Sequence, residues 1–557
     1  MQASAFWLQL EAQNFSSSIF DTQDLSTIRG GSLLLRDLVY EVDAYLREQF
    51  VDHVEAATLG GSIGVWRLTI PNSQAQKLGA NIRTKFNASD FKHVGFGIAI
   101  ITESDAGYRH HRAELIAVLQ RQRLQQTRIK FPELENTEYH VCPIDLVRPE
   151  GAKKQKVGPG QVIRPSESVY ARRKFGIEKK QSLIEAEIGS LSDDLAASYK
   201  EIRANARPFA MQINSISEGA APPKGLKSNL EDKICIITLD GNGFGKIQDL
   251  ALSTNDTIEG QRAFDQDLAK IRAGIVKRVY TKLLEKGGIG PPSEQERIVR
   301  EELHDAAIDN IIRFEMLLWG GDEIMFIVPA RIGWELIVEA SDAISSLRLN
   351  DKPVTFSIGA VFCHHDAPIS RIKHLADSLA EHVKSLKIKG LNDNDKNIGR
   401  DGKADTLILP QVLESFDHIG NNLDDFLKDQ WPKPTEEPLH PRTEEEAFDV
   451  LELQEMCLLR NAAQDLASGI GGQISRGRLR KTAHALQYGK VAGAQYSGQK
   501  WVHYISSTAE LLNGDNCLKA IEYLGRDRFF VLLERFWDYL VPIRATDLFD
   551  PNGGDAG

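Results

Sequence analysis

The chain has 557 residues, of which 42% are hydrophobic and 26% are charged, and its formal net charge is −11 at pH 7. This length and apolar content predict three or four domains with packed cores, whereas the negative charge argues against a general nucleic-acid binder. We recognise no signal peptide or transmembrane run, and the five cysteines have no paired spacing, so we expect a cytoplasmic protein without a membrane anchor, a disulfide framework or a zinc site.

Residues 1–135 are predicted to form a first mixed domain. Its most distinctive features are the sequence Leu10-Glu11-Ala12-Gln13-Asn14-Phe15, a glycine turn at Gly60-Gly61-Ser62 and an apolar strand over residues 94–101. The next segment, residues 136–230, is a basic connector that is rich in loops and partly helical. Its cations form two groups: Lys153, Lys154 and Lys156, and then Arg172, Arg173, Lys174, Lys179 and Lys180.

The second domain, residues 231–420, contains the strongest motif of the chain. A buried strand is predicted to end at Asp240, and the glycine loop Gly241-Asn242-Gly243-Phe244 follows it. Further on, two apolar runs flank the turn Gly320-Gly321-Asp322-Glu323. Two glycines permit a tight turn and leave room for a phosphate. Acids at the ends of neighbouring strands offer the few carboxylate oxygens that Mg²⁺ takes from a protein.

A strand over residues 353–362 and a helix over residues 369–389, with Lys384 near its end, complete the second domain. A linker over residues 430–438 leads to a C-terminal domain, residues 435–557, whose apolar periodicity predicts a helical bundle. This last part contains a third basic run, which consists of Arg476, Arg478, Arg480 and Lys481.

The second domain resembles the palm domain of the nucleotide cyclase and GGDEF superfamily in the order strand, helix, hairpin, helix, strand, helix. Asp240 matches the first metal-binding acid of that superfamily, and Gly320-Gly321-Asp322-Glu323 matches its signature turn. The later strand is matched by Thr355-Phe356-Ser357-Ile358-Gly359. Lys384 matches a lysine that the superfamily places near the triphosphate.

The N-terminal domain repeats this pattern. Leu10 to Phe15 aligns with Leu239 to Phe244, and Leu59-Gly60-Gly61-Ser62 aligns with Trp319-Gly320-Gly321-Asp322. Two such domains in one chain, with an Arg-Gly-x-Ser sequence at Arg29 to Ser32, resemble the large polymerase subunit of type III CRISPR effector complexes over about the first 420 residues. The implied fold is α+β: two ferredoxin-like palm domains, the first degenerate, joined by the connector and followed by the helical domain.

The resemblance implies roles for the motif residues. Asp240 and Asp322, with the carbonyl of Gly241, are expected to hold Mg²⁺ or Mn²⁺, and Glu323 is expected to bind a second metal or to orient the attacking hydroxyl. Lys384 would meet the β- and γ-phosphates. The same resemblance assigns these residues to nucleotide binding: Gly241, Asn242, Gly243, Phe244, Gly320, Gly321, Lys384, Gly60, Gly61 and Ser62. Because a hydroxyl does not replace a carboxylate on magnesium, the first domain is expected to bind rather than catalyse.

The chain departs from many members of that family in two ways. It begins almost directly at the first palm, without a histidine-aspartate nuclease domain, so we expect no DNA cleavage. The zinc module that often lies between the palms is represented only by Tyr139-His140-Val141-Cys142-Pro143, so we expect no zinc. The basic runs are interpreted as solvated surface or as contacts to guide or target RNA or to an acidic subunit of the complex.

These features predict a magnesium-dependent nucleotidyltransferase that makes a cyclic oligonucleotide second messenger, most simply cyclic oligoadenylate from ATP, in antiviral defence. Two alternatives remain open. The chain is a cyclic dinucleotide synthase that uses ATP or GTP and acts alone, or it is a catalytically silent scaffold that binds RNA or proteins.

Overall fold

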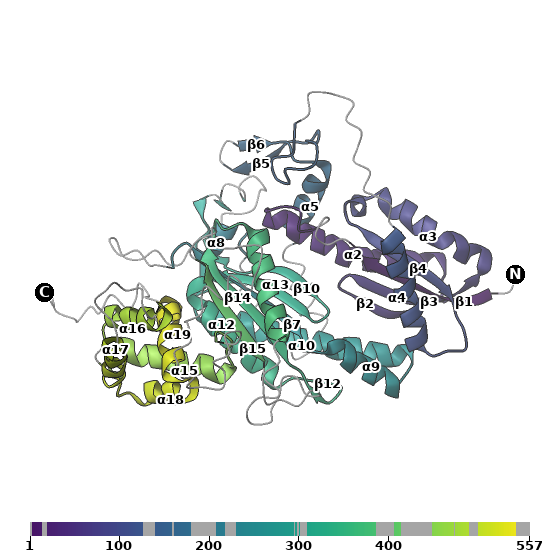
Figure 1. The fold of residues 1–557 in the computed structure, drawn as a ribbon. Helices are drawn as coiled ribbons and strands as arrows, with labels where there is room; N and C mark the ends of the chain where they lie inside the picture. The colour runs from purple at the N-terminus through teal and green to yellow at the C-terminus, as the bar shows by residue number, and fades with distance from the viewer. Residues whose placement is uncertain are drawn as a thin grey trace.

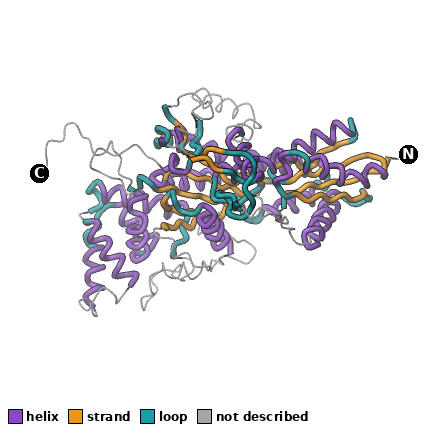
Figure 2. Tube along the Cα trace, turned by 90° about the horizontal axis from the view of Figure 1, so that it is seen from above, coloured by secondary structure: helices purple, strands orange, loops and turns teal. Residues whose placement is uncertain are grey.

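The structure, a computed structural model, has two β-sheets in a row with a helical part beyond the second sheet (Figures 1 and 2). It describes residues 3–13, 19–125, 140–158, 161–179, 208–217, 230–294, 296–297, 300, 309–385, 406–413, 448–472, 474–488 and 499–541. This mixed α/β architecture with several sheets and a helical C-terminal region agrees with the expected class at that level. The predicted linker over residues 430–438 lies outside the described residues.

The first sheet has the strand order β2-β3-β1-β4. Its elements are β1 (Ala3–Ala12), α2 (Leu25–Gln49), β2 (Val54–Gly60), β3 (Ile63–Pro71), α3 (Asn72–Asn87), the 3₁₀ helix η1 (Asp90–His93), β4 (Phe96–Thr102) and α4 (Tyr108–Gln125). Asp24 caps α2, because its carboxylate accepts a hydrogen bond of 2.8 Å from the backbone of Thr27. The resulting order of elements, β-α-β-β-α-β, is that of a ferredoxin-like fold.

The second sheet has the order β10-β11-β7-β14-β15. It consists of β7 (Lys233–Gly241), β10 (Glu315–Gly320), β11 (Glu323–Pro329), β14 (Phe356–His364) and β15 (Leu407–Leu413). Four helices lie between these strands in the sequence: α9 (Phe244–Thr254), α10 (Ile258–Glu285), α12 (Ala330–Ser345) and α13 (Ile369–Ser385). Its first four strands follow the same connection order as β2, β3, β1 and β4, and β15 adds a strand parallel to β14. Short two-residue strands lie outside it: β8 (Ile289–Gly290), β9 (Ile311–Ile312), β12 (Arg348–Leu349) and β13 (Lys352–Pro353).

Strand β7 lies in the middle of the second sheet, which explains its unbroken apolar sequence. From Ile234 to Ile237 every residue is fully buried, as expected for a strand that is covered on both faces. Helix α10 leaves this sheet and reaches β2 of the first sheet. The two sheets are therefore bridged by a helix that belongs, in sequence, to the second one.

The connector contains β5 (Gln155–Gly158), β6 (Gln161–Ile163), α5 (Glu167–Glu178) and α8 (Ile213–Ser217). Helix α5 lies against α2 at two glycines: a methyl group added at Gly30 would lie 1.7 Å from the carbonyl oxygen of Arg172. No side chain fits between these helices at that point, so the glycines set their close packing.

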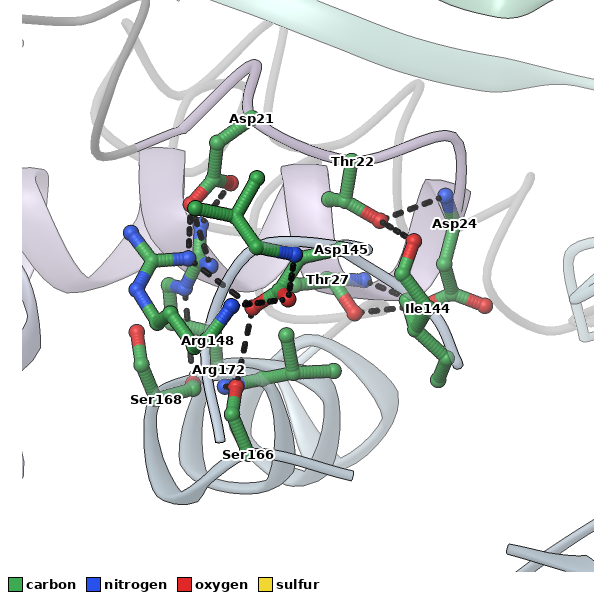
Figure 3. Close-up of polar contacts among 12 residues, drawn as sticks. Asp21, Thr22, Asp24, Thr27, Ile144, Asp145, Arg148, Ser166, Ser168 and Arg172 are labelled. Carbon is green, nitrogen blue, oxygen red and sulfur yellow. Dashed lines mark hydrogen bonds and ion pairs between the residues drawn. The ribbon is translucent and has the colours of Figure 1, made fainter. Parts of the chain in front are cut away.

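Two of the basic connector residues are buried in this contact, and the expectation that they are solvated or face RNA is wrong. Arg172 donates hydrogen bonds of 2.8 and 3.0 Å to the carboxylate of Asp21, and its side chain is fully buried. Arg173 pairs with Asp24 at 3.3 Å. Figure 3 shows Asp21 held between Arg172 and Arg148. Buried cations need such partners, because an unpaired charge away from water is costly. The neighbouring lysines Lys153, Lys154, Lys174 and Lys179 are exposed, as expected.

The C-terminal part consists of α15 (Leu453–Ala467), α16 (Arg476–Tyr488), α17 (Gln499–Ala509), α18 (Asp515–Leu524) and α19 (Arg526–Leu540). It is tied internally by the buried pair of Arg528 and Glu455 at 2.6 Å. It contacts the second sheet's helix α12 through Trp334 and Phe536, whose rings lie 5.1 Å apart. Across the part of the chain that the structure describes, none of the helices combines the length and apolarity that crossing a membrane requires.

Candidate active site

The hairpin of β10 and β11 carries the Gly-Gly-Asp-Glu sequence, as predicted. Gly321 has a φ of +56°, a left-handed conformation that glycine adopts without the penalty other residues incur. Arg272 of α10 donates a hydrogen bond of 3.0 Å to the carbonyl oxygen of Gly321. The turn is thus shaped by its own glycine and supported from the bridging helix.

The end of β7 brings Asp240 to this hairpin. Glu323 and Asp240 are direct partners in the antiparallel pairing of β11 with β7, so their side chains lie on the same face of the sheet. The backbone of Gly241 donates a hydrogen bond of 3.0 Å to the carbonyl oxygen of Asp322. A methyl group added at Gly241 would lie 2.7 Å from Cβ of Asp322, so only glycine allows this approach. The structure therefore gathers Asp240, Asp322 and Glu323, the three predicted acids.

The three acids create an excess of negative charge. Burial raises the pKa of Asp322, and the nearby charge of Asp240 adds to this effect. Burial likewise raises the pKa of Glu323, and the charges of Asp240 and Asp322 raise it further. The positive charges of Lys384 and Arg272 near Asp322, and of Lys373 near Glu323, lower these pKa values only in part.

Lys384 of α13 supplies one positive charge. Its ammonium nitrogen lies 2.8 and 2.9 Å from the two carboxylate oxygens of Asp240 and 3.2 Å from the carbonyl oxygen of Gly241. These are the oxygens that sequence analysis assigned to a metal ion, so the donor set fits a cation: the ammonium group stands in for one. Carboxylate and carbonyl oxygens are also the donors that Mg²⁺ prefers. The phosphate contact expected of Lys384 stays a prediction.

The loop after Asp240 is held by the neighbouring strand. The backbone of Asn242 donates to the carbonyl oxygen of Thr355 at 2.9 Å, and its side-chain oxygen accepts from the hydroxyl of Ser357 at 2.9 Å. Gly243 has a φ of +68° and is the N-cap residue of α9, which begins at Phe244. Phe244 is buried against Phe356, with ring centroids 5.3 Å apart. These residues position the site, and Phe244 packs in the core.

The first sheet builds a matching turn. Gly61 has a φ of +53°, and Ala12 donates a backbone hydrogen bond of 2.9 Å to the carbonyl oxygen of Ser62. This bond corresponds to the one between Gly241 and Asp322 in the aligned positions. Glu11, which aligns with Asp240, pairs with Arg123 of α4 at 2.6 Å. We call each sheet with the helices of its part of the chain a unit. In the first unit Arg123 therefore occupies the place that Lys384 occupies in the second.

This Glu11–Arg123 pair is the part of the site that sequence analysis missed. The sequence alignment paired Glu11 with Asp240, but it matched no residue of the first domain to Lys384. The cation that pairs with Glu11 was therefore not identified. The signal that was available is the acid itself, at the end of the first strand.

The two glycine turns face each other. A methyl group added at Gly61 would lie only 3.3 Å from Cα of Gly320. A cavity of about 1380 Å³ lies beside them and is lined from both units, with Gly60, Gly61 and Ser62 on one side and Gly320, Gly321, Asp322 and Glu323 on the other. Its volume exceeds the ~300–1,000 Å³ of a typical small-molecule site. Among the residues that line it, Glu11 and Arg123 come from the first unit, whereas Asp240 and Lys384 are outside the lining.

One further group of potential metal ligands occurs within the described ranges: His364, His365 and Asp366, whose ligand atoms lie within 4.8 Å of one another. In the pairing of β14 with β7, His364 faces Lys233, whereas Phe356 faces Gly241. Since Asp240 pairs with Ser357, seven residues of extended strand, about 23 Å, separate this group from Asp240. It does not belong to the site.

Comparison with known proteins gives structural neighbours only. No family model and no curated protein matches the chain. The solved structures include a Csm1–Csm4 cassette in complex with one ATP (11% identity, 95% of this chain and 70% of that chain, TM-score 0.48) and one in complex with cA4 (12%, 97% and 70%, 0.44). Csm1 in T. onnurineus is also similar (12%, 96% and 69%, 0.47). These neighbours are type III CRISPR proteins, the group whose large subunit the motifs resemble.

Proposed function

We propose that the chain is a metal-dependent nucleotidyltransferase that joins nucleoside triphosphates into a cyclic oligonucleotide, most simply cyclic oligoadenylate from ATP. The observation that carries this proposal is the gathering of Asp240, Asp322 and Glu323 at one glycine turn that closely faces a second glycine turn beside a cavity. In this proposal the two sheets are the two palm domains, and only the second one is catalytic.

The acids suit phosphoryl transfer. Asp240, Asp322 and the carbonyl of Gly241 would hold Mg²⁺ or Mn²⁺, which neutralises triphosphate charge and acidifies the attacking hydroxyl when it is bound. Glu323, on the same face as Asp240, would orient that hydroxyl or bind a second ion. Lys384 would then exchange its contact with Asp240 for the β- and γ-phosphates, since its side chain is partly exposed and long enough to turn.

Two facing half-sites suit a reaction that needs two nucleotides, one with a 3′-hydroxyl and one with an α-phosphate. Holding both within one chain makes their encounter intramolecular, which is worth a large part of the barrier. The Gly60-Gly61-Ser62 turn, which lacks a carboxylate, would hold the nucleotide that needs no metal-binding acid, and Arg123 would offer its guanidinium to that nucleotide's phosphates.

Substrate and partners are further parts of the proposal. We propose ATP as the substrate. GTP is the alternative, because the acid and glycine motifs contain no residue that distinguishes one base from another. The similar Csm1–Csm4 structures include complexes with one ATP, with cA3 and with cA4. For this chain we propose the corresponding setting: other CRISPR effector subunits and guide or target RNA as partners, in the cytoplasm, without zinc.

The test is to incubate the purified chain with Mg²⁺ and each of the four labelled triphosphates and to resolve the products by mass. We expect an ATP-derived cyclic product that disappears in Asp322→Ala/Glu323→Ala. Asp366→Ala, which removes an exposed acid at the far end of β14, is the matched control and should retain the product. A cyclic dinucleotide without added RNA would favour the synthase that acts alone. No product from the wild type, even with Mn²⁺ and target RNA, would favour a silent scaffold.

A further inference from the structure

Helix α10 lines the cavity with polar groups that the phosphoryl-transfer site does not use. Its residues Gln261 and Asp265 face the cavity together with Thr58 of β2, Arg112 of α4 and Gln248 of α9. Four elements from both units thus contribute to one polar wall. Gln261 and Asp265 lie on the same helix as Arg272, whose hydrogen bond supports the glycine turn at Gly321.

These side chains form a chain of hydrogen bonds with a fixed direction. Arg112 donates to the amide oxygen of Gln248 at 2.7 Å, and the amide nitrogen of Gln248 donates to the oxygen of Gln261 at 3.0 Å. The amide nitrogen of Gln261 then donates to Asp265 at 2.7 Å. Since Arg112 has only donors and an ionised Asp265 has only acceptors, both amides are held in one orientation and the chain ends on the carboxylate.

Asp265 keeps accepting capacity at the end of this chain. An ionised carboxylate offers about four lone-pair positions, and besides Gln261 its side-chain partner is Thr58. Burial raises the pKa of Asp265 to about 6, and the hydrogen bonds from Thr58 and Gln261 and the charges of Arg272 and Arg112 offset this effect only in part. A ligand that donates a hydrogen bond into the cavity would relieve this.

The position of Asp265 matches the length of a nucleotide. It precedes Arg272 on the same helix by two turns, about 10 Å along the axis, and Arg272 contacts the Gly321 carbonyl. A triphosphate at the glycine turn would therefore have its base near Asp265. Phe264 and Leu268, both buried and both in the cavity wall, supply apolar surface for the face of a base. Apolar walls with a few placed polar groups are the usual composition of a ligand site.

We propose that Asp265 selects the base of the bound triphosphate by accepting a hydrogen bond from an exocyclic amino group, so that the site takes ATP, GTP or CTP and disfavours UTP and ITP. This inference rests on the proposed function and adds the base-reading residue that the motifs lack. Gln261, Gln248 and Arg112 act through Asp265 and are positioning residues.

The test compares ATP with ITP, which carries a carbonyl oxygen in place of the amino group of adenine, in calorimetric titrations of the full chain with Mg²⁺. We expect the wild type to bind ATP about tenfold or more tightly than ITP, since a hydrogen bond to a charged group is worth about 1.5–3 kcal/mol. Asp265→Leu should bring this ratio close to one. Asp267→Leu, two residues away on the exposed side of α10, should leave the ratio unchanged.

A second variant covers the case in which Asp265→Leu does not fold. Gln261→Met keeps the carboxylate but removes its orienting donor, so the ATP to ITP ratio should fall without being lost. A purely structural role for Asp265 would weaken ATP and ITP equally, and that result would overturn the inference. So would a wild type that binds both equally. If the wild type binds no triphosphate at all, the proposed function itself fails.

Discussion

The two sheet units of this molecule share a backbone design and differ in their acids. Both place a glycine in the left-handed region, at Gly61 and Gly321, and both hold the turn with a hydrogen bond from the end of the first strand. The second unit continues with Asp322 and Glu323, whereas the first continues with Ser62 and Ile63. The comparison teaches that the turn is built by glycine and backbone contacts, so it survives without the carboxylates.

The charges around the two turns differ accordingly. In the first unit Glu11 is matched by Arg123, one acid against one cation. In the second unit Lys384 is matched by Asp240 while the nearby Asp322 and Glu323 have raised pKa values. Only the second unit therefore has the surplus of negative charge that a divalent ion would neutralise.

The largest expected effect is on the rate of product formation, and it differs between the two turns. Asp322→Asn should reduce product formation about a thousandfold or more, because it removes a proposed metal ligand whose contribution is several kcal/mol. Ser62→Ala, the matched change in the first unit, should alter the rate by less than about threefold. Rates of product formation under saturating ATP measure both. Equal losses in the two variants would contradict the assignment of catalysis to the second unit.

The second largest effect is expected at the buried ion pair that joins the two units. Arg29 of α2 donates to both carboxylate oxygens of Glu315 on β10, and the two side chains are each 2% exposed. Glu315→Ala should lower the free energy of unfolding by about 3–5 kcal/mol, because it leaves a buried guanidinium without its partner. Denaturant unfolding measures this.

The double variant Arg29→Met/Glu315→Leu is the control for that joint. It removes both charges and should recover most of the lost stability. Exposed acids such as Asp267 should tolerate substitution with little change. A double variant as unstable as Glu315→Ala would show that the loss of stability does not come from an unpaired buried charge.

Alanine substitutions at the two turn glycines, Gly61 and Gly321, are expected to have smaller effects on stability that also distinguish the two turns. Gly321→Ala should cost about 1–2 kcal/mol of stability, from the left-handed backbone alone, since nothing lies within 4 Å of the added methyl group. Gly61→Ala should cost this amount and in addition weaken nucleotide binding, because its methyl group would press on Gly320. Unfolding and calorimetric titration of both variants separate strain from contact. Identical behaviour would argue against the close approach of the two turns.

The smallest expected effect is a dependence on pH. Because the folded-state pKa values of Asp322 and Glu323 are raised, the folded chain binds more protons than the unfolded chain between the ordinary and the raised values. Without metal, the free energy of unfolding should therefore fall as the pH rises through that interval. Asp322→Asn should flatten this slope, and Mg²⁺ should oppose it by binding the ionised acids. Melting temperatures from pH 4 to about 8, with and without Mg²⁺, test the sign.

Sequence analysis predicted the part of the site that holds the three acids better than its surroundings. The positions of Asp240, Asp322 and Glu323 follow from a strand end and a hairpin, which are local features. The partners of Arg172 and Arg173 do not, because Asp21 and Asp24 lie far away in sequence and come near only when α5 packs on α2.

The same reason explains what was missed at the cavity. Glu11 aligned with Asp240 in the sequence, yet its cation, Arg123, is brought to it only by the packing of α4 on the first sheet. Asp265 and Gln261 have helical spacing and resemble an ordinary exposed face until α10 is seen to bridge the two sheets. Patterns along the chain predict elements, whereas contacts between distant elements require the fold.

The most direct test of two facing half-sites in one chain is the number of nucleotides that the chain binds. Calorimetric titration with a non-hydrolysable ATP analogue and Mg²⁺ should give two sites per chain. Asp240→Ala/Asp322→Ala should lose one of them, and Arg123→Ala should weaken the other. A single site per chain in the wild type, lost in the acid variant and unaffected by Arg123→Ala, would contradict the account.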